Sequence, residues 1–395
     1  MTKTNVPRLR FSEFSGEWRE EKLDNLSERI TRKNKDLESE LPLTISAQFG
    51  LIDQETFFNK KVASKDLSNY FLIKNGEFAY NKSYSNGYPF GTIKSLKKYN
   101  MGVLSSLYIV FDIKKNNNHL FFDSFFDSSH WHKEVSTKTT EGARNHGLLN
   151  ISPQEFMNIR ILFPYNISEQ QKIGDFFAKQ DKLIELQIKK VDQLKKLKRG
   201  YLQKMFPQEG ETVPRLRFSG FSGEWKEEKL GDVTIRFDNK RVPIKESNRV
   251  HGCVPYYGAN GIQDYVEGMT HTGNNILIAE DGANDINNYP VFHTEGNIWV
   301  NNHAHVLKSQ KNKSDSLFIS YCLKMIPYSK YLTGNGRYKL NADVLMEIKV
   351  NIPCLSEQQK IGSFFAKIDK LIEEQSNKLN QLKQQKKAYL QKMFI

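Results

Sequence analysis

The sequence is poor in cysteine and has no long apolar run. Its only three cysteines, Cys253, Cys322 and Cys354, are scattered among 395 residues and form no Cys-x-x-Cys pair. This pattern argues against a disulfide framework and against a structural zinc site. No segment approaches the roughly 18 apolar residues that a membrane span requires. The polar, basic start of the chain predicts no secretory signal. We therefore expect a reduced, cytoplasmic protein with no metal site.

Motifs of enzymes that act on DNA are also missing. An adenine methyltransferase needs a polar-Pro-Pro-aromatic pocket, and the sequence contains no Pro-Pro dipeptide. There is no Gly-x-x-x-x-Gly-Lys-Ser/Thr loop to hold nucleotide phosphates and no Gly-x-Ser-x-Gly turn. The sequence also lacks a spaced acidic cluster with a lysine, the pattern that would suggest a nuclease. We expect a chain with no catalytic residues and no bound cofactor.

The chain is basic, with a net charge of +13 and a sequence pI of about 9.3. Such a balance favours a polyanionic partner, with nucleic acid the first candidate and a membrane surface the second. Two segments carry much of the excess: residues 168–205 have ten Lys/Arg against five Asp/Glu, and residues 356–393 have eight against four. These lysines form either a solvated helix face or a ridge beside a phosphate backbone.

The chain is an internal duplication. Residues 6–26 (VPRLRFSEFSGEWREEKLDNL) match residues 213–233 at 16 of 21 positions, and residues 167–206 match residues 355–394 at 28 of 40. Between these repeated pieces lie two stretches, 27–166 and 234–354, with no extended identity. The chain therefore reads as one scaffold written twice around two different inserts.

The longer repeated piece predicts a helix of about 55 Å in each copy. Apolar residues recur at three- and four-residue spacing, and Ser168 with Gln171, like Ser356 with Gln359, has the sequence of a capping box. Two such helices can bury their apolar stripes against each other as a coiled coil. A twofold relation between the copies makes the pair antiparallel. The inserts read as mixed α/β, with strands expected near Leu107–Phe111 and Asn275–Ala279 and a turn at Asn260-Gly261.

This arrangement resembles the specificity subunit of type I restriction–modification systems over essentially the whole chain. The strongest marks are the paired SEQQKIG helix starts and the paired PRLRF…FSGEW segments. In the inserts, GEFAYNK (76–82) with PFG (89–91), and DGA (281–283) with NNHAH (301–305), look like two common types of target domain.

The resemblance implies an α+β fold with two α/β target-recognition domains separated by two long antiparallel helices. Each domain would read one half of a split DNA target, and the helices would set the spacing between halves. The expected partners are double-stranded DNA, two modification subunits that methylate adenine with S-adenosylmethionine, and two restriction subunits that use ATP and Mg. The expected division is 1–166 for domain 1, 167–206 for helix 1, 207–213 for a linker, 214–354 for domain 2 and 355–395 for helix 2.

Base reading requires side chains with paired donors and acceptors, such as Arg or Lys for guanine and Asn for adenine. Polar, glycine-flanked loops supply them, although such loops are often only turns. The candidates in the first insert are Tyr80, Asn81, Lys82, Ser83, Tyr84, Arg144, Asn145 and His146, with Lys94, Lys97 and Lys98 as phosphate contacts or a solvated turn. The candidates in the second are Tyr256, Tyr257, Asn260, Asp281, Asn284, Asn301, Asn302, His303, His305, Arg337, Tyr338 and Lys339.

Two further residue types have competing interpretations. His130-Trp131-His132 and His303-Ala304-His305 place two imidazoles on one strand face if extended, for a structural role, DNA contact or, least of all, metal binding. Trp18 and Trp225 lie in the matched pieces, so we expect packing anchors rather than stacking platforms. Two alternative functions also stand beside DNA reading: a coiled-coil scaffold whose inserts bind proteins, and an autonomous nuclease.

Overall fold

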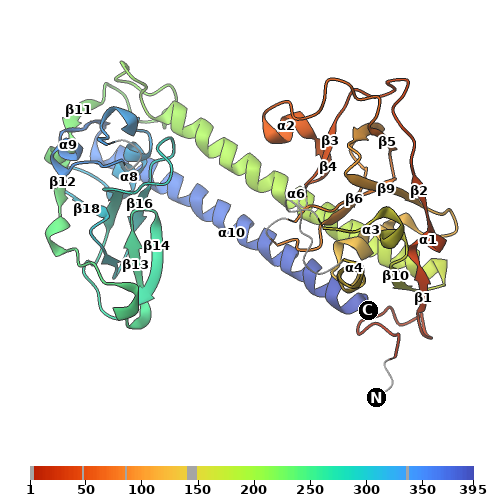
Figure 1. Ribbon diagram of the computed structural model, residues 1–395. Helices are drawn as coiled ribbons and strands as arrows, with labels where there is room; N and C mark the ends of the chain where they lie inside the picture. The colour runs from red at the N-terminus through yellow and green to blue at the C-terminus, as the bar shows by residue number, and fades with distance from the viewer. Residues whose placement is uncertain (1–3, 47–48, 85–86, 140–148, 335–337) are drawn as a thin grey trace. The chain divides into compact units, whose positions relative to one another are not determined.

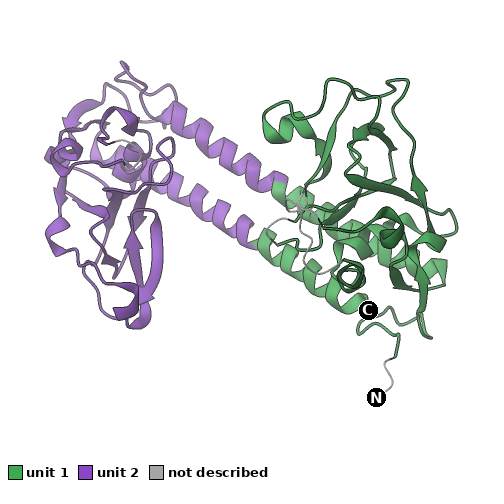
Figure 2. Cartoon of the chain, in the orientation of Figure 1, with its two compact units in different colours: residues 1–188, 378–395 green, residues 189–377 purple. Residues whose placement is uncertain are grey.

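The computed structural model describes residues 4–46, 49–84, 87–139, 149–334 and 338–395. Two compact units are present (Figure 2): unit 1 comprises residues 1–188 and 378–395, and unit 2 comprises residues 189–377. Each unit thus holds one insert together with parts of both long helices, and each is described by itself. Among the described residues, no helix is both long and apolar enough to cross a membrane.

The described residues of unit 1 and of the helix that leaves it form sixteen helices and strands, most of which are labelled in Figure 1. In chain order they are β1 (Arg19–Lys22), α1 (Leu23–Leu26), β2 (Ser27–Ile30), β3 (Leu43–Ser46), β4 (Gly50–Asp53), α2 (Gln54–Phe58), β5 (Phe71–Lys74), β6 (Phe78–Asn81), β7 (Thr92–Ser95), β8 (Met101–Leu104), β9 (Tyr108–Ile113), α3 (His119–Asp127), α4 (His132–Lys138), α5 (Pro153–Met157), β10 (Arg160–Phe163) and α6 (Ile167–Met205).

Unit 2 follows a similar order of elements, with three short 3-10 turns η1 to η3. They are β11 (Lys226–Lys229), α7 (Leu230–Val233), β12 (Thr234–Arg236), η1 (Asp238–Lys240), η2 (Glu246–Asn248), β13 (His251–Gly258), β14 (Gly261–Val266), β15 (Asn275–Ala279), β16 (Val291–Thr294), β17 (Trp299–Val300), β18 (Ala304–Ser309), α8 (Ser316–Lys324), η3 (Tyr328–Lys330), α9 (Ala342–Glu347), β19 (Lys349–Ile352) and α10 (Leu355–Met393).

The two inserts share a sheet topology that their sequences hide. Unit 1 has a four-stranded sheet in the order β2-β9-β6-β7, and unit 2 has one in the order β12-β18-β15-β16. All the pairings in both sheets are antiparallel. In each unit a helix packs on this sheet, α3 in unit 1 and α8 in unit 2. A two-stranded ribbon, β1-β10 or β11-β19, joins the matched entry segment to the strand before the long helix.

Both long helices are continuous over 39 residues, as the repeat predicts. The start of α6 lies two residues before the expected position, with Asn166 and not Ser168 as the capping residue. The side chain of Asn166 accepts a hydrogen bond from the backbone N–H of Ser168 at 2.8 Å, so Ser168 lies in the first turn and not at the N-cap. The predicted capping box with Gln171 is therefore wrong, because the Gln171 amide instead donates to Asp175 at 2.8 Å.

The helices run antiparallel within each unit, as predicted. In unit 1 the rings of Phe176 and Tyr389 are 5.1 Å apart, and Lys386 binds Asp181. In unit 2 the matched contacts recur 188 residues away in the sequence, with Phe364 5.2 Å from Tyr201 and Lys198 bound to Asp369. The same pairing scheme is therefore used twice, once in each unit.

Each core is completed by the end of the helix that comes from the other copy. In unit 1, Met393 and Phe394 at the end of α10 are buried with Trp18, Phe121 and Phe125. In unit 2, Met205 and Phe206 at the end of α6 are buried with Trp225 and Phe318. Trp18 and Trp225 are each only 2% exposed, which confirms their role as packing anchors.

The entry segments attach to both helices by matched polar contacts. Arg10 donates to the buried Glu169 at 2.7 Å, and Arg217 donates to the buried Glu357 at the same distance. The backbone N–H of Leu9 donates to the carbonyl oxygen of Lys392 at 2.9 Å. These contacts pin each entry segment to the start of one helix and the end of the other. Since the units take in pieces of both helices, they cut across the predicted domain limits, which stay a prediction.

A glycine in each long helix allows a close approach of the packed helix. At Gly174 an added Cβ would lie 2.7 Å from the Cβ of Leu120. At Gly362, its partner in the second copy, it would lie 2.9 Å from the Cβ of Leu317. A methyl group at either position would overlap the first turn of α3 or α8.

Candidate nucleic-acid interface

In unit 2, the polar residues singled out from sequence gather where β15 ends and β18 begins. We call this edge 2: residues 280–284 after β15, residues 301–303 before β18, the β13–β14 turn at Ala259–Asn260, and residues 338–340. The backbone N–H of Glu280 donates to the His303 carbonyl oxygen at 2.8 Å, and that of Leu340 donates to the Glu280 carbonyl oxygen at 2.7 Å. These two bonds hold three of the four stretches together.

Side-chain hydrogen bonds fix the loops of edge 2. The Asn260 amide donates to the carbonyl oxygen of Gly282, and its oxygen accepts from the backbone N–H of Asn284, both at 2.9 Å. His303 Nδ1 binds the Asp281 carboxylate. Asn260, Asn284, Asn302 and Lys339 are exposed. This edge therefore presents amides, an imidazole and an ammonium group, which are the groups that base edges and phosphates require.

A charged network lies directly under edge 2. The carboxylates of Asp238 and Glu280 and the imidazole of His305 come together as three groups of metal-ligating type, a cluster that our sequence analysis did not anticipate. The guanidinium of Arg241 donates to Glu280 at 2.6 Å, and His305 Nδ1 is 2.7 Å from Asp238. The carboxylates are thus paired with cations of the chain itself, which is the chemistry of an ion-pair network that supports the loops.

The groups around Asp238 determine its pKa. Burial by itself would raise the pKa, but the hydrogen bonds from His305 and from the backbone N–H of Val306, with the charge of Arg241, lower it below its ordinary value. Asp238 therefore keeps its negative charge under edge 2.

Unit 1 has an equivalent edge, edge 1, where β6 ends and β9 begins. It comprises residues 81–84, 87–90, 105–107 and 149–150. The backbone N–H of Leu149 donates to the carbonyl oxygen of Lys82 at 3.0 Å, which corresponds to the bond between Leu340 and Glu280 in unit 2. Both inserts thus return to the end of the same sheet strand through a leucine, although the loops before it differ in sequence.

Several candidates on edge 1 remain accessible. Tyr84 is 48% exposed, whereas Asn81, Lys82 and Ser83 are half-buried. The Lys82 ammonium donates to the Ile151 carbonyl oxygen at 3.3 Å, so it also closes the loop. Arg144, Asn145 and His146 lie outside the described residues, as does Arg337 in unit 2.

Three candidates are buried, and the expectation of direct DNA contact is wrong for them. Tyr80 is inaccessible and donates its hydroxyl to the Phe90 carbonyl oxygen at 2.8 Å, and burial raises its pKa. Tyr256 is 1% exposed, with its hydroxyl accepting from the Ile244 N–H at 3.0 Å. His305 is also 1% exposed. Their polar tips are satisfied inside the fold, so they position the edges rather than face a ligand.

A fourth candidate, Asn301, is also buried, and two aromatic candidates are half-buried. Asn301 is 4% exposed, and its side chain accepts from the backbone N–H of His303 at 2.8 Å, which makes it a loop-shaping residue. Tyr257 and Tyr338 are half-buried. The interpretation of His130-Trp131-His132 as an extended segment is wrong, because His132 begins helix α4 and Trp131 is buried.

The lysines expected as phosphate contacts differ from one another. Lys94 binds the Asp127 carboxylate inside the fold, and Lys97 lies 3.0 Å from Asp123 but is 59% exposed. The Lys98 ammonium lies 5.8 Å from the centre of the Phe49 ring. Lys97 and Lys98 thus remain accessible, whereas Lys94 serves a structural ion pair.

A basic cleft beside edge 1 was not anticipated. It has a volume of about 430 Å³ and is lined by the loop after β6, the end of α3 and the last turns of α10. Lys383, Lys386 and Lys387 on α10 and Lys94 on β7 line it. Lys386 and Lys94 both bind Asp127, while Lys383 and Lys387 are exposed. The basic run KQQKK at the end of α10 is the sequence signal that points to it.

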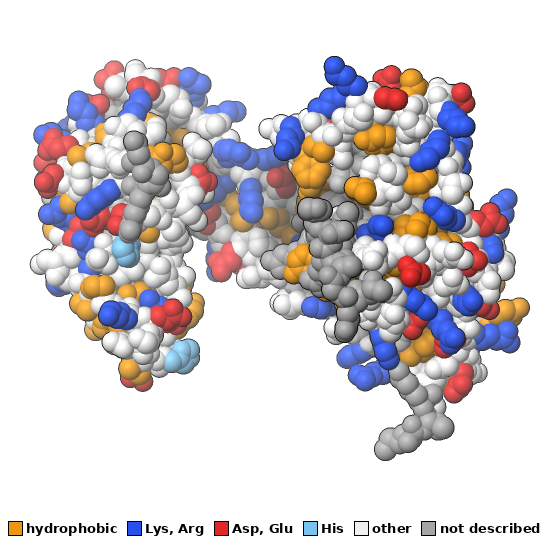
Figure 3. Space-filling view, viewed as in Figure 1, with side chains coloured by type: hydrophobic (Ala, Val, Ile, Leu, Met, Phe, Trp, Pro, Cys, Tyr) orange, Lys and Arg blue, Asp and Glu red, His pale blue; other side chains and the backbone are white. Residues whose placement is uncertain are grey.

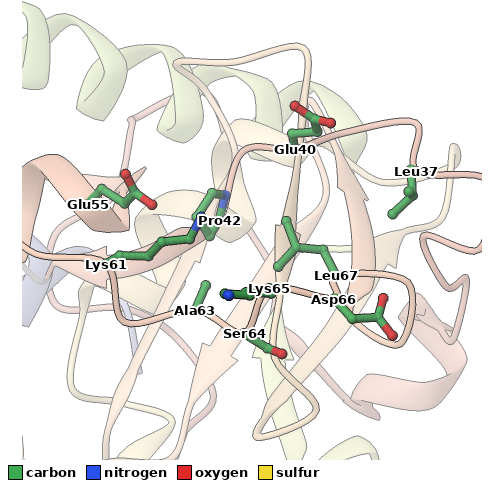
Figure 4. A pocket seen from close by; sticks show the side chains of 10 residues that line it. All are labelled: Leu37, Glu40, Pro42, Glu55, Lys61, Ala63, Ser64, Lys65, Asp66 and Leu67. Atoms are coloured by element: carbon green, nitrogen blue, oxygen red, sulfur yellow. The ribbon is translucent and has the colours of Figure 1, made fainter.

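A second cavity in unit 1 has different chemistry. It holds about 270 Å³ and lies between residues 37–42 and 61–67, with Glu55 at its rim (Figure 4). Its side chains alternate in sign, with Lys61 and Lys65 near Glu40 and Asp66. Such a mixed lining favours no anion. On the visible face of both units, basic and acidic side chains are likewise interspersed (Figure 3).

Comparisons with known proteins show which proteins this chain is similar to. Residues 222–384 match a family model described as the type I restriction modification DNA specificity domain. A putative type I restriction enzyme specificity subunit of Haemophilus influenzae, S.HindORF215P, is 44% identical over 142 residues, 36% of either chain. The MjaVIII specificity subunit of Methanocaldococcus jannaschii is 24% identical over 73% of this chain and 72% of its own.

Solved structures agree on the fold. The S subunit of a type I system from M. genitalium superposes with a TM-score of 0.68 at 17% identity, covering 99% of both chains. The predicted family resemblance is confirmed. This chain is similar to type I specificity subunits. The match to the Haemophilus specificity subunit spans about a third of that protein's length, so its activity and partners do not transfer directly. The edges described above are among the parts of this specificity-subunit fold that differ between its two units.

Proposed function

We propose that this chain is the DNA-specificity subunit of a type I restriction–modification complex, in which each unit reads one half of an asymmetric, split target. The observation that carries the proposal is a contrast between the frame, by which we mean the entry segments, the long helices and the common sheet order, and the two edges. The two units share entry segments, helix contacts and sheet order, yet edge 1 and edge 2 present different side chains. One frame that carries two different polar edges suits two different half-sites.

In this proposal the long helices fix the gap between half-sites and hold the modification subunits. Each helix has 39 residues, or about 58 Å at 1.5 Å per residue. Half-sites on one face of B-DNA recur about every 34 Å. The chain itself supplies recognition, while adenine methylation with S-adenosylmethionine and ATP-driven restriction with Mg belong to two modification and two restriction subunits, in the cytoplasm.

The test is a map of methylated adenines in cells that express the chain with its cognate modification subunit. Cells expressing the modification subunit alone are the control. We expect a motif of two short halves around a fixed gap, seen only when the chain is present. A chain-independent pattern, or no motif despite a stable complex, would contradict the proposal.

An exchange of residues 27–166 for those of a related subunit sharpens the test. Because edge 1 lies wholly within this insert, the exchange should change one half of the methylated motif and leave the other half and the gap as they were. If both halves of the methylated motif changed together, the assignment of one unit to one half-site would be wrong.

A further inference from the structure

The basic cleft beside edge 1 has two walls that come from different parts of the chain. One wall belongs to the first insert and includes Thr92 at the start of β7 and Ser129 just after α3. The other wall is the end of α10, with Lys383, Lys386 and Lys387. All of these residues belong to unit 1. The cleft therefore lies between an insert and the frame helix that packs against it.

Two of the lysines that line the cleft hold its walls together. Lys94 on β7 and Lys386 on α10 both bind Asp127 at the end of α3. Their side chains are only 23% and 13% exposed, and Lys386 also binds Asp181 on α6. These ion pairs fix α10 against the insert, and both ammonium groups are occupied within the fold.

The other two lysines point to a ligand from outside the chain. Lys383 and Lys387 are exposed and lie four residues apart, on one face of α10. No acidic residue in the described part of the chain forms an ion pair with either of them, and residues 378–395 hold five lysines and no Asp or Glu. A lysine offsets the helix dipole only in the last turn, and both residues precede the last turn of α10, which ends at Met393. The fold itself therefore gives these two charges no partner.

A tightly held turn joins the cleft to edge 1. Gly87 and Tyr88 belong to edge 1 and also line the cleft. The backbone N–H of Gly91 donates to the Tyr88 carbonyl oxygen at 3.3 Å, and a Cβ added at Gly91 would overlap the carbonyl oxygen of Asn81 at the end of β6. Because phosphate backbones border the groove from which bases are read, a basic cleft that shares a turn with a reading edge is placed to meet one of them.

We infer that the basic cleft binds the phosphate backbone of DNA beside the half-site read by edge 1, with Lys383 and Lys387 as the phosphate contacts. The inference rests on the proposed function and adds a role for α10, which belongs to the frame and not to the insert. Ammonium groups bind phosphate whatever the bases are, so the choice of sequence stays with edge 1. The hydroxyls of Thr92 and Ser129 on the opposite wall are further donors of the kind that contact phosphate. An exchange of the insert would change the half-site and keep the two lysine contacts.

The experiment measures the salt dependence of DNA binding. The chain is purified with its cognate modification subunit, and fluorescence anisotropy follows its binding to a labelled duplex that carries the methylated motif, over a series of NaCl concentrations. In Lys383→Gln combined with Lys387→Gln, the slope of log affinity against log salt should become shallower by about 2, since each lost phosphate contact removes about 0.9. The affinity at about 0.1 M salt should fall about tenfold. The methylated motif itself should keep its sequence and its gap.

The matched control removes the same charge from the same end of α10. Lys378 and Lys392 are exposed and lie five residues before Lys383 and five after Lys387, a spacing that turns a helix by about 140°. Lys378→Gln combined with Lys392→Gln should keep the salt slope of the unaltered chain. Ser129→Asp tests the other wall, because its added carboxylate should weaken binding of the duplex several-fold at low salt and less at high salt, where the charge is screened.

The remaining outcomes would assign the cleft differently. Equal slopes in the double variant and its control would overturn the inference and make the two lysines a solvated helix face. If calorimetry showed that the double variant loses binding of inorganic phosphate or ATP while its affinity for the duplex is unchanged, the cleft would be a site for free phosphate. Fewer modification subunits in the native mass of the double variant would make the lysines a protein contact, and a changed motif would show that they read bases.

Failure of the proposed function gives a separate signal. If the unaltered complex binds the motif duplex no better than a scrambled duplex, the proposed function is wrong. The salt slopes of the double variant and its control on the scrambled duplex would still decide for or against a phosphate site in the cleft.

Discussion

Units 1 and 2 use the same frame but hold the incoming helix end with different electrostatics. At the last residue of α3, unit 1 has Asp127, which binds Lys386 of α10 at 2.7 Å and also Lys94. The corresponding residue at the end of α8 in unit 2 is Lys324. There Lys198 is bound by Asp369, which also accepts a hydrogen bond from the Tyr321 hydroxyl at 2.7 Å.

This difference separates what the frame needs from what each insert adds. The aromatic contacts of the helix ends recur in both units, with Phe394 5.7 Å from Phe177 and Phe206 5.9 Å from Phe365. The Asp127 pair has no counterpart at Lys324. Apolar packing is therefore the shared basis of helix docking, and ion pairing with the insert is a local addition. Four predictions follow this comparison from its largest expected effect to its smallest.

Removing the ring of the docked phenylalanine tests the shared basis. Phe394 and Phe206 are 2% and 4% exposed, so Phe394→Ala and Phe206→Ala should each cost about 3–5 kcal/mol in the unit that receives the ring. Hydrogen exchange followed by mass spectrometry should show lost protection in unit 1 for the first variant and in unit 2 for the second. Phe57→Ala, at an exposed ring, is the control. Loss of protection restricted to the helix end itself would contradict the shared core.

A methyl group at the close helix contact tests whether both units share the same steric limit. Gly174→Ala and Gly362→Ala should each destabilise by about 1–3 kcal/mol, because the helix on the sheet must move. Gly200→Ala is the matched control: its added Cβ meets nothing within 4 Å and the second copy has Ala388 there. That variant should gain up to about 1 kcal/mol from helix propensity. Urea unfolding of the three variants measures the change in the free energy of unfolding for each.

Replacing the carboxylates by amides tests how much the ion pairs stabilise the docked helix ends. Asp127→Asn removes the shared partner of two partly buried lysines and should cost about 1–2 kcal/mol, less than a fully buried pair because part of the site is open to water. Asp369→Asn, at a more exposed carboxylate, should cost below about 1 kcal/mol. Thermal unfolding monitored unit by unit with hydrogen exchange measures both. An unchanged stability of Asp127→Asn would show that unit 1 gains nothing from the Asp127 ion pairs.

Acid should weaken unit 1 through the same residue. Burial would raise the pKa of Asp127, but the charges of Lys94 and Lys386 hold it well below its ordinary value. A carboxyl with a depressed pKa contributes stability above the unfolded value of about 3.9, and this contribution is lost as the pH falls further. Between pH 5 and pH 3, exchange protection of unit 1 should fall more steeply in the unaltered chain than in Asp127→Asn. The same pH dependence of exchange protection in both proteins would show that the Asp127 carboxyl is not the source of the acid sensitivity.

The sequence predicts the frame better than the edges, for physical reasons. Duplication exposes whatever both copies must keep, so Trp18, Trp225 and the two long helices could be identified without a structure. The common sheet order was hidden, because a strand such as β6 or β15 needs only apolar side chains of suitable size, and these were exchanged freely between copies. The cap of the first long helix was placed two residues too late, at Ser168, because Asn166 also caps well.

Errors among the site residues share one cause. Tyr80, Tyr256 and His305 carry polar tips that suit DNA, but backbone groups of Phe90, Ile244 and Leu340 satisfy those tips inside the fold. Such partners are distant in sequence and leave no local pattern. The exposed amides Asn260, Asn284 and Asn302 were identified as candidates because each lies in a polar loop, but their meeting at one edge was not predicted.

The exchange of helix ends has a consequence for synthesis. Trp18 and its packing partner Phe394 are separated by 376 positions of the sequence, so Trp18 is synthesised long before Phe394. Closing so long a loop is slow compared with local contacts. The first insert must therefore wait, with its aromatic groove uncovered, until translation of α10 is nearly finished. A chain that stops before the end of α10 would lack Met393 and Phe394, and the core of unit 1 would be left without these two buried side chains.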